Sequence, residues 1–145
     1  MQKTFPLILN RLISNPKKLF LIDSLGALLT AFLLGTILTR LEEHFGMPRK
    51  VLYLLSILAC IYAVYSISCY FFAGVYWRPF LKLIAIANLI YCCIITVVVI
   101  SFYRALTILG LTYFLGEVLI IGGLVYIEAL TIAKSNNIYI SETNP

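Results

Sequence analysis

The chain has 145 residues, of which 62% are hydrophobic and only 12% are charged. An average soluble domain is about 45–50% apolar and about 25% charged. A soluble domain of this size could not bury so much apolar surface, so the composition excludes soluble globular, disordered and coiled-coil proteins and predicts a polytopic membrane protein. The net charge of +5 comes from basic residues at the ends of apolar runs, which suits contact with lipid headgroups and not with nucleic acid.

The first element in chain order is an amphipathic helix expected within residues 1–18. Thr4 suits the cap of such a helix and Pro6 its first turn. A helix of this length is too short to span a bilayer, so we expect it to lie flat at the membrane interface. Its apolar stripe follows the spacing i, i+3, i+4, i+7, i+8 and consists of Phe5, Ile8, Leu9, Leu12 and Ile13.

Four apolar runs follow, each long enough to cross a membrane as a helix of about 20 residues. They cover about residues 19–38, 51–73, 83–101 and 106–133. Together they predict an all-α fold, a four-helix transmembrane bundle over residues 19–134. Residues 135–145 form a polar C-terminal tail.

The four cysteines lie inside the apolar runs, and none of them forms a CxxC pair. We therefore expect small buried apolar side chains and not disulfides or a zinc site. His44, the single histidine, stands with Glu42 and Glu43 in a loop that is better explained by solvation than by metal binding. The sequence accordingly predicts no metal and no cofactor.

Charged residues inside membrane spans are functional candidates by default. Asp23, Asn88 and Glu128 each lie about 7–9 Å from the basic residue that ends their run, at about 1.5 Å of rise per residue. All three therefore fall in one layer of the predicted bundle. Two interpretations stay open. In the first, the layer is a substrate site. In the second, Asp23 and Glu128 lie close enough to the membrane interface to contact water or Lys82.

Glu117 lies deeper than the other two acids. It stands about 19 Å beyond Arg104 along its helix, near the middle of the membrane. An ionised carboxylate without a cation is costly there, so we expect it to be protonated, hydrated or hydrogen-bonded. Tyr62 and Thr96 lie at about the right depth to bond it, and Tyr113 shares its helical face. Two interpretations of Glu117 stay open. It is a functional group that relays protons or binds a cation, or it is a neutral carboxylic acid that hydrogen-bonds to a neighbouring helix.

These residues favour a small carrier or channel-like protein with a polar intramembrane site. The candidate site residues are Glu117, Asp23, Glu128, Asn88, Tyr62, Tyr113 and Thr96. The alternative is a non-catalytic membrane subunit or scaffold that packs against a partner protein. No nucleophile–base pair or metal constellation points to an enzyme. The expected partners are the lipid bilayer and either a second copy or another membrane protein.

The orientation follows from basic residues near the spans. The termini and the second loop carry seven of the 11 basic residues and the other side carries four, which predicts a bacterial inner-membrane protein with both termini in the cytoplasm. In a variant free of native cysteines, Lys3→Cys and Ser141→Cys should resist a membrane-impermeant thiol reagent on intact cells, whereas Glu43→Cys should react. All three should react after permeabilisation, and labelling of either terminus from outside would reverse the orientation.

Overall fold

The computed structural model describes the backbone of residues 4–143 and the side chains of residue 7 and residues 10–136. The described part is helical and contains no strand. In chain order its elements are α1 (Thr4–Ile13), α2 (Pro16–Phe32), the π-helix η1 (Leu33–Leu38) that continues α2, α3 (Glu42–Phe45), α4 (Arg49–Phe72), α5 (Trp77–Ser101) and α6 (Ile108–Thr143).

Four helices are long and apolar enough to cross a membrane, which confirms the all-α prediction and indicates a multi-pass membrane protein. These spans are Pro16–Leu38, Arg49–Phe72, Trp77–Ser101 and Ile108–Asn136. Large apolar side chains point outward from every span, among them Leu25, Leu54, Leu89 and Leu119. In water such a surface would cause aggregation, whereas in lipid it costs nothing.

Two helix boundaries differ from the sequence-based prediction. The third span begins at Trp77, six residues before the predicted start at 83, because Pro79 fits the first turn of a helix, where its missing N–H has no partner to lose. The last helix continues to Thr143, so the polar residues after 134 extend α6 as a helix.

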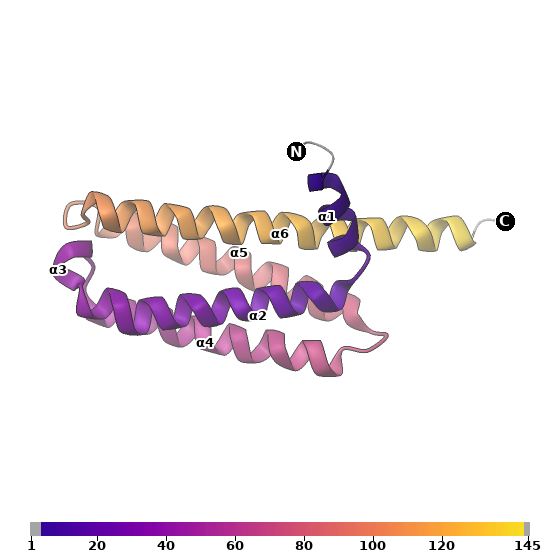
Figure 1. Ribbon diagram of the computed structural model, residues 1–145, viewed down its shortest axis with the longest axis horizontal. Helices are drawn as coiled ribbons and strands as arrows, with labels where there is room; N and C mark the ends of the chain where they lie inside the picture. The colour runs from indigo at the N-terminus through magenta and orange to yellow at the C-terminus, as the bar shows by residue number, and fades with distance from the viewer. Residues whose placement is uncertain (1–3, 144–145) are drawn as a thin grey trace.

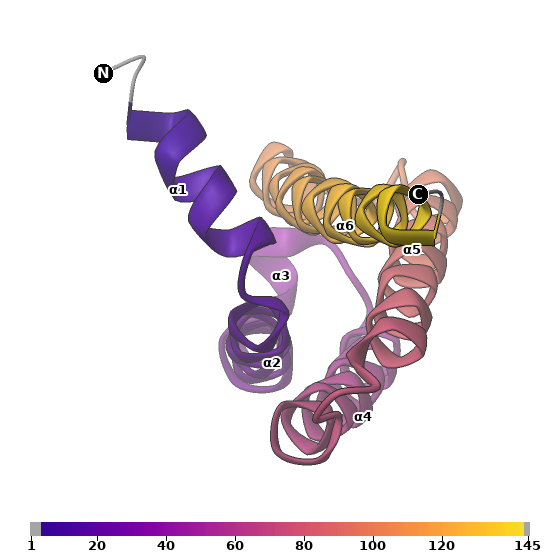
Figure 2. The ribbon, with the colours of Figure 1, turned by 90° about the vertical axis from the view of Figure 1, so that its right-hand side faces the viewer.

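The spans run alternately up and down, so the start of α2 and the end of α6 lie toward one end of the bundle and α3 lies at the other (Figure 1). Helix α2 packs along α4, and α5 packs along α6. Viewed end-on, the order α2, α4, α5, α6 traces an arc, with α2 and α6 at its two ends and α1 crossing beside them (Figure 2). Contacts between these two helix pairs are few, both where α4 meets α5 and where α2 meets α6. We call the region between α2 and α6 the seam.

Two apolar cores occupy the two ends of the bundle. The core near α3 consists of Leu34, Leu38, Phe45, Met47, Leu52, Leu55, Tyr91, Ile95 and Phe114. The core near the termini consists of Leu19, Phe20, Cys69, Ala73, Leu81 and Ile84. The polar side chains that the sequence singled out lie between these two cores.

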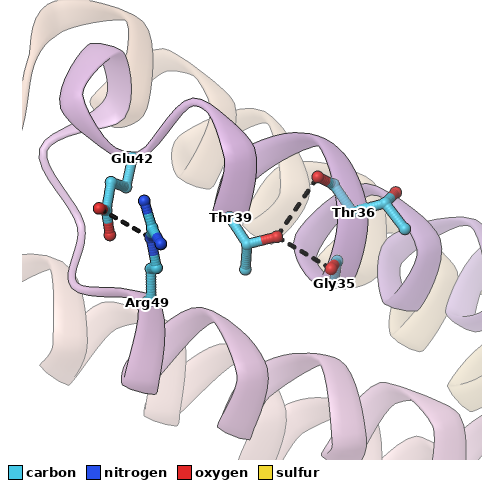
Figure 3. Close-up of polar contacts among 5 residues, drawn as sticks. All are labelled: Gly35, Thr36, Thr39, Glu42 and Arg49. Atoms are coloured by element: carbon cyan, nitrogen blue, oxygen red, sulfur yellow. Dashed lines mark hydrogen bonds and ion pairs between the residues drawn. The ribbon is translucent and has the colours of Figure 1, made fainter.

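The π-helix η1 is a feature that hydropathy did not predict. Hydroxyl groups bond backbone carbonyls on both sides of it. Ser56 of α4 donates to the carbonyl of Ala31 at 2.8 Å, and Thr39 donates to Gly35 at 2.9 Å and to Thr36 at 3.3 Å (Figure 3). The Ser56 bond joins α4 to the last turn before η1, whereas the Thr39 bonds lie within the same helix.

The end of the bundle near α3 is closed by polar contacts between loops. Arg49 of α4 pairs with Glu42 of α3 at 2.7 Å (Figure 3). Thr107 caps α6, since its hydroxyl accepts the amide of Gly110 at 3.2 Å and donates to the carbonyl of His44 at 2.5 Å. Helix α3 is thereby fastened to the start of α6.

Glycine is required where α3 meets α6. A Cβ on Gly110 would stand 2.3 Å from the carbonyl oxygen of Phe45. We expect Gly110→Ala to lower the free energy of unfolding by about 1–3 kcal/mol, the usual cost of overpacking. The matched control is Gly122→Ala on the same helix, where a Cβ meets nothing within 4 Å. Thermal unfolding in detergent measures both, and equal melting temperatures would contradict the close approach.

Candidate functional site

A cavity of about 310 Å³ lies between the two apolar cores. All four long helices line it, with Thr30 from α2, Tyr62 from α4, Tyr91 from α5 and Glu117 from α6. Most of its remaining wall is apolar. A largely apolar cavity with a few polar groups is the usual form of a small-molecule site.

The cavity opens through the seam between α2 and α6. Its lining includes the outward-facing Leu29 of α2, which is 58% exposed, and Ile120 of α6, which is 76% exposed. The small residues Gly26 and Gly116 also line it, and a Cβ on either would meet nothing within 4 Å. Because the rim belongs to the apolar outer surface of two spans, the opening faces the lipid side of the bundle.

Glu117 is one of the buried polar groups of the cavity wall, with 7% of its surface exposed. The hydroxyl of Tyr91 donates to its Oε1 at 3.4 Å. Its Oε2 is buried and has no hydrogen bond of good geometry among the described residues, although the hydroxyl of Thr30 lies close to the carboxyl group. One oxygen of this carboxyl group can therefore accept a further hydrogen bond or ionic contact.

A second polar group, which we call the four-helix cluster, comprises Asp23, Ser66, Asn88 and Glu128. Asn88 of α5 donates to Oδ1 of Asp23 at 2.6 Å, and Ser66 of α4 donates to Oδ2 of the same carboxylate. Asp23 is 3% exposed and Ser66 is 1% exposed. The carboxylate of Asp23 thus joins α2 to both α4 and α5.

Glu128 brings α6 into the four-helix cluster. Its side chain is fully buried and lies beside Asn88 and within electrostatic range of Asp23. Neither of its oxygens has a hydrogen bond of good geometry to the described residues. Two carboxyl groups in a low-dielectric site repel each other when both are ionised. The salt bridge found among the described residues joins Glu42 to Arg49 and involves neither Asp23 nor Glu128.

The structure brings most of the predicted site residues together. Glu117, Tyr62, Tyr113, Asp23 and Asn88 all line the cavity. Glu128 lies in the four-helix cluster, outside the cavity lining, and Thr96 does not line the cavity either.

Two sequence-based expectations about bonding are wrong. Thr96 donates to the carbonyl of Cys92 in its own helix at 2.8 Å, because a threonine inside a helix can reach a carbonyl one turn back. Tyr62 packs edge-on against the ring of Tyr91, with centroids 5.9 Å apart, and it is Tyr91 that bonds Glu117. Depth along the helices cannot distinguish these side chains, because the rotation of each helix decides which of them faces Glu117.

The interpretation that Asp23 and Glu128 meet water near the interface is also wrong. Both carboxyl groups are buried beneath the packed helices, at 3% and 0% exposure. Sequence reasoning missed Ser66 and Tyr91 as bonding partners. The available signal was weak: Ser66 belongs to a stripe of small residues on α4, and Tyr91 stands one turn after Asn88.

Cys69 and Cys92 are buried, as the sequence predicts, whereas Cys60 and Cys93 are exposed on the outer surface of the helices. Within the described residues no three His, Cys, Asp or Glu side chains come together in an arrangement that could hold a metal ion.

A larger hollow of about 490 Å³ lies beside η1, near Arg40, Arg49 and Tyr53. It contains no buried polar atom that lacks a partner among the described residues, and Arg49 is already paired with Glu42. The cavity at Glu117 is therefore the stronger candidate site.

Comparison of this chain with protein families, with curated proteins and with solved structures gives no match. The function must therefore be argued from the cavity and the four-helix cluster.

The bond between Ser66 and Asp23 can be tested with two serines of one helix. We expect Ser66→Ala to lower the free energy of unfolding by about 1 kcal/mol, the scale of hydrogen bonds between membrane helices. Ser68→Ala is the control, because Ser68 is exposed and bonds the carbonyl of Val64 in its own helix at 2.7 Å. Unfolding in mixed micelles measures the difference, and equal stability of the two variants would contradict a structural role for the cluster.

Proposed function

We propose that this protein is a small membrane carrier that takes an amphipathic molecule from the bilayer into the cavity around Glu117. The observation that supports this most directly is a buried carboxyl oxygen without a partner, Oε2 of Glu117, in the wall of a cavity that opens between two spans. A polar group left unbonded at this depth is costly. A ligand that bonds it offsets that cost.

The shape of the opening supports entry from the side. The rim at Gly26 and Gly116 carries no side chain that would close it, and the apolar lining suits the apolar part of a membrane-dissolved molecule. Hydroxyl groups of the wall, together with Glu117, would bind the polar part. They belong to Thr30, Tyr62, Tyr91, Thr112 and Tyr113.

The proposed setting of this carrier is the bacterial inner membrane, with both termini in the cytoplasm and α1 at the interface. The arrangement of α1 supports the interfacial position, because it crosses the direction of the spans (Figure 1). Its Arg11 is exposed, while Leu12 packs on the apolar core near the termini. An amphipathic helix at the membrane surface has this distribution.

The alternative function, a scaffold for another membrane protein, is supported by the same seam. Small residues allow close approach of a transmembrane helix, and Gly26, Ala27, Thr30 and Gly116 all stand along the opening. In a scaffold, a helix of the partner protein would occupy the opening between α2 and α6, which in a carrier admits the ligand. The two functions therefore differ in what enters between α2 and α6.

Photolabelling from the bilayer tests the carrier. An uncharged alkyl-diazirine probe dissolved in proteoliposomes should label the inner wall at Tyr62 and Tyr91 as well as the outer faces of the spans. Gly116→Leu should suppress labelling of the inner wall by filling the entrance, while Gly122→Leu, which faces open space elsewhere on α6, should not change it. The measurement is the position and yield of crosslinks by mass spectrometry.

Two outcomes would overturn the carrier. The first is an inner wall that stays unlabelled while the outer faces react. The second is labelling of the inner wall that Gly116→Leu leaves unchanged. A protein partner that co-purifies in a fixed ratio and is released by Gly116→Leu would establish the scaffold instead.

A further inference from the structure

We propose that the ligand of this cavity is an organic cation, bound between the carboxylate of Glu117 and the tyrosine rings, and that it enters in exchange for the proton of Glu117. This inference rests on the proposed function and specifies its substrate class and the ion that is exchanged.

The charges of the lining select the class of ligand. The lining contains two carboxyl groups, those of Asp23 and Glu117, and no Lys, Arg or His. An anion would meet carboxyl groups without a compensating positive charge. With a neutral ligand, Glu117 would either keep its proton or carry a negative charge that nothing compensates. A cation compensates the negative charge of the ionised carboxylate directly.

The aromatic side chains of the lining suit the same class of ligand. Tyr62, Tyr91 and Tyr113 contribute rings from three helices, and the rings of Tyr62 and Tyr91 meet at an interplanar angle of 70°. The two rings are in edge-to-face contact, which leaves the second face of each ring outside that contact. Quaternary ammonium groups bind to the faces of aromatic rings.

Asp23 and Glu117 differ in what already binds them. Both oxygens of Asp23 accept hydrogen bonds, from Asn88 at 2.6 Å and from Ser66. Glu117 has one oxygen bonded weakly, at 3.4 Å by Tyr91, and one oxygen without a hydrogen bond of good geometry, near the hydroxyl of Thr30. Glu117 is therefore the carboxyl group that can change its bonding partner when a ligand arrives.

The groups that face Glu117 cannot take over its proton. Thr30 of α2, Tyr62 of α4, Tyr91 and Cys92 of α5, and Tyr113 of α6 surround it; all are neutral donors, and none is a base at neutral pH. When the cation binds, the O–H bond of the carboxylic acid breaks, its electron pair stays on the carboxylate oxygen and the proton leaves to water. The exchange is one proton for one unit of positive charge, with no oxidation or reduction.

Three probes of nearly equal shape test the charge preference. They are 4-phenylbutyltrimethylammonium, the uncharged analogue in which carbon replaces the quaternary nitrogen, and the corresponding sulfonate. Titration calorimetry of the full chain in detergent should show that the ammonium binds at least about tenfold more tightly than the neutral analogue, and that the sulfonate does not bind. In the pH range where Glu117 of the empty protein carries its proton, the affinity should rise by about tenfold per pH unit, and it should level off once the empty protein has lost that proton.

Variants separate this role from a structural one. Glu117→Gln should abolish the pH dependence and the preference for the ammonium over the neutral analogue, while thermal unfolding confirms that the variant is folded. Tyr113→Leu should weaken ammonium binding by about two- to thirtyfold, the range of a cation–π contact. Tyr113→Phe keeps the ring and should retain most of the affinity.

The outcomes distinguish this inference from the proposed function. Equal binding of the ammonium and the neutral analogue at every pH, together with labelling of the inner wall from the bilayer, would overturn the inference and leave the carrier standing. An inner wall that is never labelled, with none of the three probes bound, would overturn both. Ammonium binding that Glu117→Gln leaves unchanged would overturn the exchange step.

Discussion

The hydrogen-bonded carboxylate of Asp23 is the constraint on which the bundle depends. It joins α2 to Asn88 of α5 and Ser66 of α4, and Glu128 of α6 lies beside it. Apolar packing alone allows membrane helices to rotate and slide at little cost, because lipid is as apolar as their side chains. A buried carboxylate with directional partners fixes the rotation of each helix relative to α2.

That fixed rotation determines where the cavity lies. With Asp23 turned toward α4 and α5, the neighbouring small residues Gly26 and Ala27 line the space between α2 and α6. The two apolar cores close the ends of the bundle. The hydrogen bond from the Thr107 hydroxyl to the carbonyl of His44 holds α3 against α6. Gly26 and Gly116 line the seam between α2 and α6 and carry no side chain that would fill it.

Hydropathy and charge were sufficient to predict four spans, their order and the three buried acids, because both properties are local. The contacts of the site were only partly predictable. Depth along a helix placed Asn88 and Asp23 in one layer, and the structure joins them directly. Depth could not show that Thr96 turns to its own backbone while Tyr91 faces Glu117, since this depends on helix rotation. Likewise the π-helix η1 depends on Ser56 of another span.

Glu117 and Glu128 contribute to this fold in different ways. Glu128 lies where four helices meet, beside Asn88 and Asp23 and outside the lining of the cavity. Glu117 lies at the edge of a space that no side chain fills. An apolar residue at that position would stabilise the empty bundle more, because the carboxyl group has one free oxygen and loses its hydration on burial. Both acids have buried oxygens without a good hydrogen bond, but only Glu117 lines a cavity, where a bound cation would supply the interaction that the empty site lacks.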